Sequence, residues 1–428
     1  MNREEITAID QKNIWHPLTQ HKTAQAPIAI DRAEGNYLYD FEGNRYFDAI
    51  SSWYTCSYGH RNTKLTTAVK NQLDRLHHVV FAGMTHEPAA ILSQKLLDIL
   101  PINQFKLFFS ENGSTSVEIG LKMAFQYHFN RGEKRNVVIA LENGFHGDTF
   151  GAMSASGLSV YNGAFQDFFI EVERIPAPTA SNIDEVLQKV EAIIQQNEVA
   201  SFIYEPLVQG AAAMQLNDAA AMGRLLSRFR ESGIITIADE VMTGFGKTGT
   251  NFASDQIAEK PDIICLSKAL TGGIMPMAIT SCTEEIYQAF YDDDLAKGLF
   301  HGHTYSGNPL GCAAAAAAID LLNSETIQDG IRMTTERNAV FAKSIIQHDR
   351  VAQVRHQGVI LAIDVELEMS RYGNQRDQIF NWFWERSVFL RPLGNTIYIV
   401  PPFTTTSTEL NRVYELLEEF VTTFELQN

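Results

Sequence analysis

Apolar runs that end abruptly in charged residues are the main pattern of this sequence. Ile234–Ala238 is almost entirely apolar and stops at Asp239-Glu240, and the β-branched run Asp262–Leu266 leads to Ser267-Lys268. Runs of this length and composition predict parallel strands that are buried on both faces. Because ligands bind beyond the carboxyl ends of the strands in open α/β sheets, we expect Asp239 and Lys268 to face one ligand.

A lysine amine and an aspartate carboxylate that face one ligand fit pyridoxal phosphate. The lysine forms the covalent link to the cofactor's aldehyde, and the aspartate keeps the pyridine nitrogen protonated, which makes the ring an electron sink. Each residue alone also has an ordinary explanation, because an aspartate after a strand is often a helix N-cap and a lysine is usually a solvated surface charge. The rest of the chain decides between these interpretations.

Further strand and helix patterns alternate along the middle of the chain. Strands are predicted at Phe105–Phe109, Val137–Ala140 and Ser201–Tyr204, and helices at Thr63–Leu76 and Val117–Phe129. This alternation, which extends from about residue 60 to about residue 280, predicts a doubly wound α/β domain with a mostly parallel sheet.

The two ends of the chain have a different pattern. Ala33–Asp48 alternates over short stretches punctuated by glycines, which predicts a meander, and the C-terminal part predicts helices, short strands and a closing amphipathic helix at Ser407–Phe424. We therefore expect an N-terminal segment over residues 1–57 that belongs to the small domain, a large ligand-binding domain over residues 58–312, and a small α+β domain over residues 313–428.

Two loops carry groups that suit a flat, phosphorylated cofactor. The loop over residues 110–116 leads from a strand into a helix, where Gly113 permits close approach and Ser114 offers a hydroxyl, so the helix N-terminus could hold a phosphate. The alternative there is an ordinary serine or threonine cap. In the loop over residues 142–149, the ring of Phe145 could stack on a flat cofactor.

Two other motifs point to cofactors or metals only weakly. Gly244–Gly249 matches the glycine pattern of dinucleotide-binding loops, yet no helix start follows it, and Val241 stands where a phosphate-binding loop needs glycine. We interpret this stretch as a glycine-rich loop in the wall of the site. His301 and His303 have no carboxylate or cysteine at ligand spacing, so we expect a loop there and no metal site.

Three aromatic residues, Trp53, Tyr54 and Tyr58, crowd into the segment just before the first helical pattern of the large domain. They either pack the N-terminal segment against the large domain or line an apolar pocket. The sequence favours neither alternative.

Composition limits the classes of protein to which the chain can belong. Its 428 residues are 45% hydrophobic and 20% charged, which is typical of soluble globular proteins. The 34 basic and 51 acidic residues give a net charge of −17, which argues against a nucleic-acid partner or an anionic membrane surface. We expect small-molecule substrates instead.

The cysteines and the N-terminus favour a cytoplasmic location. The four cysteines lack C-x-x-C spacing, so neither a disulfide framework nor a structural zinc site is predicted. The first residues have no apolar core of a signal peptide, and nowhere do 18 apolar residues run together.

The chain resembles the class III pyridoxal-phosphate-dependent aminotransferases over nearly its whole length. Asp239-Glu240-Val241 with the following T-G-F-G-K-T-G, and Lys268 followed by A-L-T-G-G, are similar to the signature of that family. The resemblance implies the aspartate-aminotransferase fold, fold type I, with a large domain around a mostly parallel sheet and a smaller α+β domain. Further motifs resemble one biosynthetic enzyme of the family: Trp15-His16-Pro17, Ser51-Ser52-Trp53, residues 146–154, and Arg391-Pro392 with Tyr398.

The resemblance also implies roles for individual residues. Lys268 would carry the cofactor and shuttle protons, Asp239 would partner the pyridine nitrogen, and Arg391 would pair bidentately with a substrate carboxylate. The implied cofactor contacts are Gly113, Ser114, Phe145, Asp239, Lys268 and Thr304, and the implied substrate contacts are Trp53, Tyr54, Phe145, Gly302, Arg391 and Tyr398. Thr304 would reach the cofactor of a neighbouring subunit, so the resemblance implies a homodimer with shared active sites.

Three positions depart from the most similar members of the family. Phe145 and Leu18 stand where those members usually have tyrosine, and Tyr54 stands where many have a second tryptophan. These differences leave the class intact but leave the amino donor open. The resemblance implies ping-pong transamination. Another ω-amino-acid transaminase, for ornithine, 4-aminobutyrate or β-alanine, is the enzymatic alternative, and a cofactor-binding regulator or structural protein is the non-enzymatic one.

Overall fold

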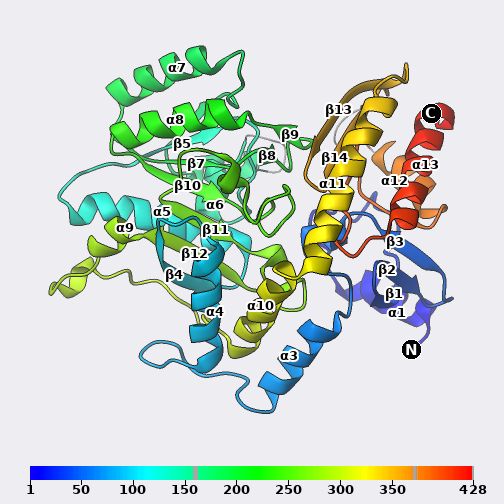
Figure 1. Ribbon diagram of the computed structural model, residues 1–428, viewed down its shortest axis with the longest axis horizontal. Helices are drawn as coiled ribbons and strands as arrows, with labels where there is room; N and C mark the ends of the chain where they lie inside the picture. Colours follow the sequence, from blue (N-terminus) through cyan, green and yellow to red (C-terminus); the bar gives the residue numbers. More distant parts are fainter. Residues whose placement is uncertain (158–161, 370–372, 374, 427–428) are drawn as a thin grey trace.

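A seven-stranded sheet forms the centre of the computed structural model, which describes residues 1–157, 162–369, 373 and 375–426 (Figure 1). Strand β12 runs antiparallel to both of its neighbours, and all other adjacent pairs are parallel. The order across the sheet is β4 (Gln104–Ser110), β12 (Ala278–Thr283), β11 (Ile263–Leu266), β10 (Ile235–Asp239), β7 (Val199–Tyr204), β5 (Val137–Leu141) and β6 (Val172–Ile175). The predicted α/β fold with a mostly parallel sheet is confirmed.

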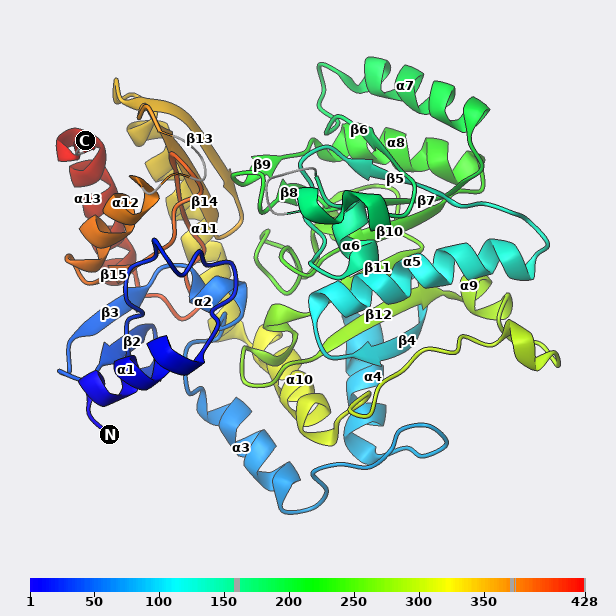
Figure 2. The same cartoon turned by 180° about the vertical axis from the view of Figure 1, so that it is seen from behind.

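The central strands bury both of their faces, as their apolar runs predicted. In β10, Ile237 packs into one hydrophobic cluster and Ala238 into another, because successive side chains of a strand point to opposite faces. The first cluster includes apolar residues of α5 (Gly113–Asn130). The second includes residues of α4 (Glu87–Ile99), α7 (Ile183–Gln196), α8 (Ala219–Glu231) and α10 (Pro309–Leu322). Figure 2 shows α5 lying across the strands on its side of the sheet.

Helix α10 owes its position to its small side chains. Asn308 caps the helix by accepting from the N–H groups of Leu310 and Gly311, and Pro309 occupies the first turn, where no N–H is needed. The alanines that follow favour helix and keep the surface narrow, so α10 packs closely against α3 (Thr63–Leu73), α4 and the 3-10 helix η3 (Lys268–Thr271). The boundary predicted after Cys312 falls inside this helix.

Two smaller sheets form the other part of the molecule, and one of them joins the two ends of the chain. β1 (Ile30–Glu34), β2 (Tyr37–Asp40) and β3 (Arg45–Asp48) form the predicted meander, and β3 pairs in parallel with β15 (Val388–Phe389). The second small sheet contains β13 (Val351–Gln357), β14 (Ile360–Val365) and β16 (Thr396–Ile399).

The long helix α11 (Glu325–Ile345) packs against β13 and β14, and both chain ends lie on the side of the small sheets (Figures 1 and 2). Helix α13 (Ser407–Thr423) closes the chain with a capping box between Thr406 and Glu409. The remaining elements are α1 (Arg3–Asn13), α2 (Ser51–Tyr54), α6 (Phe150–Ala155), η1 (Gly163–Phe168), β8 (Val208–Gln209), β9 (Gln215–Leu216), η2 (Ala253–Gln256), α9 (Glu284–Gln288), η4 (Leu295–Lys297) and α12 (Gln375–Trp384).

Within the described part of the chain, none of the helices combines the length and the apolar character that crossing a membrane would require.

Candidate active site

Lys268 lies just beyond the carboxyl end of β11. Ser267 is still extended, and Lys268 begins η3 with a left-handed φ of 50°. A residue other than glycine adopts this conformation only when its surroundings impose it, and such strain is common at functional sites. Lys268 lies deep among protein atoms, yet part of its surface remains accessible. The amine is therefore shielded from bulk water and open to a ligand.

Asp239 ends the adjacent strand β10, and its carboxylate is held on both oxygens. The Nδ1 atom of His146 lies 2.7 Å from Oδ2, and the backbone N–H of Val241 donates to Oδ1 at 3.1 Å. Both side chains are buried, and Nε2 of His146 has no hydrogen-bond partner within the described residues. The imidazole thus fixes the orientation of the carboxylate, as partners behind a functional group commonly do.

Glu205 follows the next strand, β7, and is a second buried carboxyl group at this edge of the sheet. Its two oxygens accept hydrogen bonds from the backbone N–H groups of Phe145, at 2.9 Å, and Gly210, at 2.8 Å. Burial raises the pKa of Glu205 to about 7, the charge of Asp239 adds to the rise, and His146 opposes it. Glu205 is therefore a group that can hold or release a proton near neutral pH.

Replacing Glu205 with glutamine should change how stability depends on pH. A carboxyl group with a raised pKa keeps its proton longer in the folded protein than in the unfolded chain, so the free energy of unfolding falls as the pH rises from 4.5, the ordinary value, to about 7. Over that interval the wild type should lose about 3 kcal/mol relative to Glu205→Gln. Urea unfolding of both cofactor-free proteins at about pH 5 and about pH 8 measures this difference. Parallel pH profiles would contradict it.

The amine of Lys268 is tuned for covalent chemistry. Burial lowers its pKa, while the negative charges of Asp239 and Glu205 oppose that shift. Its Nζ also lies 5.0 Å from the centre of the Tyr54 ring, a distance at which an aromatic face attracts a cation. A lowered pKa increases the fraction of neutral amine, which is the nucleophilic form.

The N-terminus of α5 has the features of a phosphate site. Gly113 and Ser114 are its first residues, and their backbone N–H groups have no acceptor among the described residues. A Cβ atom on Gly113 would lie 2.8 Å from a methyl carbon of Val241, and one on Gly147 would lie 2.2 Å from Oγ of Ser114. Only glycines therefore fit these two places, and α5 starts close to the segment that follows Asp239.

Aromatic residues connect Lys268 to Arg391. The hydroxyl of Tyr54 donates to that of Tyr398 at 2.9 Å, and the guanidinium carbon of Arg391 lies 5.6 Å from the centre of the Trp53 ring. Within the described residues, no carboxylate lies within ion-pair distance of Arg391. Arg391 is thus an exposed cation beside an aromatic wall, with no acidic side chain to neutralise it.

Two predicted site residues lie in an exposed loop. Gly302 and Thr304 are both exposed, and neither makes a hydrogen bond to another predicted site residue within the described part of the chain. Next to them, His303 Nε2 lies 2.8 Å from Glu111, and His301 Nδ1 lies 3.1 Å from Lys122. The structure therefore does not bring this loop to Lys268 within one chain.

The glycine-rich stretch between β10 and η2 forms turns, as the absence of a helix signal predicted. Its Lys247 is fully buried and donates to the carbonyl oxygen of Gly244 at 2.7 Å. A Cβ atom on Gly246 would lie 2.7 Å from a methyl carbon of Ile331 in α11. The stretch thus packs the segment after β10 against the long helix.

These residues fit pyridoxal phosphate. The cradle at Gly113, Ser114 and Gly147 suits a phosphate, Asp239 suits a protonated ring nitrogen, and Lys268 suits the aldehyde. Phe145 is 42% exposed, so a flat cofactor could reach it for stacking. When bound, the cofactor would supply an electron-withdrawing ring that stabilises negative charge on the substrate carbon.

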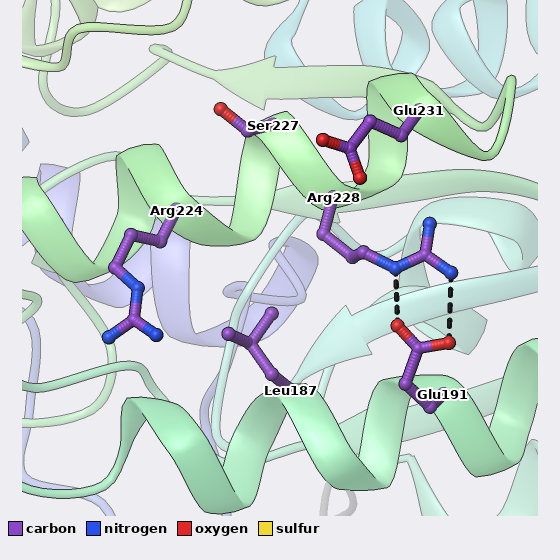
Figure 3. Close-up of a pocket in the computed structure, with 6 residues that line it drawn as sticks. All are labelled: Leu187, Glu191, Arg224, Ser227, Arg228 and Glu231. Atoms are coloured by element: carbon purple, nitrogen blue, oxygen red, sulfur yellow. Dashed lines mark hydrogen bonds and ion pairs between the residues drawn. The ribbon is translucent and has the colours of Figure 1, made fainter.

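A shallow surface pocket lies elsewhere, between α7 and α8 (Figure 3). Arg228 forms a bidentate ion pair with Glu191 there, so its charge is already neutralised. Neither helix carries a predicted site residue, and the pocket offers no nucleophile beside a base. We assign it no catalytic role.

Comparisons with known proteins identify the family. The sequence model of the class III aminotransferases matches residues 18–421. The chain therefore belongs to the class III aminotransferases, as the sequence predicted, and pyridoxal 5′-phosphate is its cofactor. A solved amine transaminase from an uncultivated Pseudomonas species, in the pyridoxal-phosphate-bound form, is 28% identical, with a TM-score of 0.88 and coverage of 95% of this chain and 97% of that chain.

Relatives that carry one particular enzyme name are more similar in sequence. The adenosylmethionine-8-amino-7-oxononanoate aminotransferase of Synechococcus elongatus is 38% identical over 96% of this chain and 98% of its own length. The crystal structure of the enzyme with that name from Methanocaldococcus jannaschii is 34% identical, with a TM-score of 0.92 and coverage of 98% of this chain and 99% of that chain.

Proposed function

We propose that this enzyme transfers an amino group to the ketone of 8-amino-7-oxononanoate, which gives 7,8-diaminononanoate, a step of biotin biosynthesis. S-adenosylmethionine is the proposed amino donor. The observation that carries the proposal is Arg391, which lies beside the Trp53 ring and has no acidic partner among the described residues, while the ring of the neighbouring Tyr54 lies 5.0 Å from Nζ of Lys268. A cation next to an apolar wall suits a carboxylate at the end of a long apolar chain. The names of the full-length relatives support the same substrate.

Each site residue has its own role in the proposed reaction. The Lys268 amine, whose pKa is lowered by burial, takes the proton from the substrate carbon and later returns one. Asp239, which is held by His146 and by the backbone N–H of Val241, would favour the protonated form of the cofactor's ring nitrogen. Glu205 holds a proton near the amine, and Arg391 and Trp53 fix the far end of the substrate. The two half-reactions then follow each other at one site.

The amino donor has an alternative. Sulfonium and adenine groups bind well to aromatic faces, and Trp53, Tyr54 and Phe145 offer three of them. Leu18 offers none and is 52% exposed. A lysine-using version of the same enzyme needs no adenine pocket, and an ω-transaminase of another substrate is the wider alternative, since solved ω-transaminases share the fold with TM-scores up to 0.93.

Separate half-reactions test the donor. The enzyme with bound cofactor is mixed with S-adenosylmethionine, lysine, ornithine or 4-aminobutyrate, and the absorbance of the cofactor reports its conversion to the amine form. We expect conversion by S-adenosylmethionine. Conversion by lysine alone would replace the donor and keep the acceptor, whereas conversion only by ornithine or 4-aminobutyrate would overturn the proposed function.

The acceptor is tested on the aminated enzyme. 8-Amino-7-oxononanoate should return the cofactor to its starting absorbance, and simple oxoacids should not. Arg391→Ala should weaken binding of the oxononanoate by about 2–5 kcal/mol, the range for loss of one partner of a desolvated charge pair. An unchanged Michaelis constant in that variant would show that Arg391 does not bind the substrate carboxylate.

We also propose a homodimer with shared active sites and a cytoplasmic location. The dimer is supported by the exposed positions of Gly302 and Thr304, which suit contacts to a second chain. The location is supported by four free cysteines, which a reducing compartment preserves. Sedimentation of the purified protein tests the dimer.

A further inference from the structure

A left-handed turn presents the aromatic residues of the site. The element α2 is not a right-handed helix, because φ is 48° at Ser51, 46° at Ser52, 63° at Trp53 and 71° at Tyr54. Residues with a Cβ atom visit this region singly and at an energetic cost, so four in succession are unusual. Such strain persists only where surrounding contacts impose it. The turn therefore needs an anchor.

The strained residues are those that face the site. Trp53 is 45% exposed and lies beside Arg391, and the Tyr54 ring lies 5.0 Å from Nζ of Lys268. The chain after the turn packs against the loop that follows Lys268, since a Cβ atom on Gly273 would lie 2.7 Å from Sγ of Cys56. A right-handed turn would send both aromatic side chains in other directions.

The anchor is the carboxylate of Asp48, the last residue of β3, which has no exposed surface. Oδ1 accepts from the backbone N–H of Ser52 at 2.9 Å, and Oδ2 accepts from the Ser52 hydroxyl at 2.7 Å. The ring of His60 lies on the other side, with Nε2 2.8 Å from Oδ2. A buried carboxylate needs such partners, and two of its hydrogen bonds go to a strained residue of the turn.

His60 completes the charge balance. Burial alone would lower its pKa, but the hydrogen bonds and charges of Asp48 and Cys56 raise it to about 10. The imidazole is therefore protonated at neutral pH and donates to the carboxylate. At the other end of the turn, the hydroxyl of Ser51 donates to the carbonyl oxygen of Val400 at 2.7 Å. The turn is thus held from β3 and from the end of β16.

We propose that Asp48, Ser52 and His60 are positioning residues, which hold the left-handed turn and thereby set the place of Trp53 and Tyr54 against the substrate. None of the three is expected to touch the reacting atoms. This inference rests on the function proposed above only for the identity of the substrate. These three residues should affect substrate binding, because Trp53 and Tyr54, which they hold in place, would contact the far end of the substrate, whereas Lys268 and Asp239 lie at the carboxyl ends of other strands.

The first test compares two buried carboxylates. Asp48→Asn keeps the shape, but its single amide oxygen can replace only one of the two carboxylate oxygens, so it loses either the hydrogen bond from the Ser52 backbone N–H at Oδ1 or the contacts of the Ser52 hydroxyl and His60 at Oδ2. The Michaelis constant of the acceptor should therefore rise about tenfold, while kcat changes by less than about threefold. Asp40→Asn is the matched control, because Asp40 is also buried but accepts from Asn44 and Tyr46 in the β2–β3 hairpin. Equal effects of the two substitutions would overturn the proposal.

A double-mutant cycle tests whether Asp48→Asn raises the Michaelis constant by displacing Trp53. In a Trp53→Ala background, Asp48→Asn should raise the Michaelis constant by less than about twofold, because coupled residues are not additive. A tenfold rise that persists in that background would contradict the positioning role. Ser52→Ala should reproduce part of the effect and Ser52→Thr should restore it, so the proposal stays testable if Asp48→Asn folds poorly.

A readout without substrate separates this inference from the proposed function. Hydrogen exchange of the backbone amides over residues 51–56 is measured on the enzyme with bound cofactor. Asp48→Asn should accelerate that exchange at least about tenfold, because it weakens the anchor of the turn, and Asp40→Asn should not. Unchanged hydrogen exchange in Asp48→Asn would refute the proposal that Asp48 holds the turn, even if the acceptor substrate proves to be another ketone.

Discussion

Replacing Lys268 with alanine should abolish transamination while the cofactor still binds through its phosphate. The cradle at the N-terminus of α5 does not involve Lys268, so binding should weaken without disappearing. The variant lacks both the nucleophile and the group that moves the proton. Loss of general acid–base catalysis alone costs about 10²–10⁴-fold in rate, so we expect a loss of at least about 10⁴-fold.

Labelling distinguishes Lys268 from the other buried lysine. Burial lowers the pKa of Lys247 to about 7, with help from the charge of Lys268, so acidity alone does not single out one of the two amines. Their contacts differ, because the amine of Lys247 donates to Gly244 whereas that of Lys268 lies among Asp239, Glu205 and Tyr54. Borohydride reduction should therefore attach the cofactor to the peptide that contains Lys268. A label on Lys247 would refute the assignment.

The sequence predicted β4, β5, β7, β10 and β11 of the large sheet from their apolar runs, but it did not predict β6 or β12. The run ending at Asp239 and the run ending at Leu266 became β10 and β11, adjacent and parallel. Lys268 and Asp239 could be placed at one edge of the sheet for the same reason. A helix N-terminus near Gly113 and Ser114 was also predictable, since these residues follow a strand and come just before a helical pattern.

Contacts between residues distant in sequence could not be predicted. Tyr54 and Tyr398 are 344 positions apart and meet through their hydroxyls, and no local pattern indicates that pairing. Glu205 directly follows the predicted strand Ser201–Tyr204, but the sequence does not reveal its raised pKa, because that shift depends on complete burial in the fold. His146 belonged to a recognised motif, but its contact with Asp239 spans 93 positions.

The left-handed turn has no sequence signal of its own. Left-handed residues are usually glycine or asparagine, and Ser51–Tyr54 contains neither. The alternative of core packing or pocket lining for Trp53, Tyr54 and Tyr58 is resolved differently for each of them. Tyr58 is buried at 1% exposure and packs against Phe403, whereas Trp53 is half exposed beside Arg391.

Replacing Asp239 with asparagine should remove most of the rate of proton abstraction and leave the cofactor bound. The Asp239 carboxylate lies in a buried setting, where a negative charge favours the protonated form of a nearby ring nitrogen. Asparagine keeps the size and can still accept from Nδ1 of His146, but it carries no charge. The ring would then withdraw electrons less strongly, and we expect a rate loss on the order of 10³-fold, or about 4 kcal/mol of barrier.

His146→Asn is the matched control, because it removes the partner that orients the carboxylate and keeps the charge of Asp239. Loss of a supporting partner typically costs about 10–100-fold, so this variant should remain clearly more active than Asp239→Asn. Single-turnover measurements with a donor deuterated at the carbon that loses its proton isolate the proton-transfer step. Asp239→Asn should show a large isotope effect, because that step becomes rate-limiting. Near-wild-type turnover in Asp239→Asn, or an equal loss in both variants, would show that the charge of Asp239 is not what drives the chemistry.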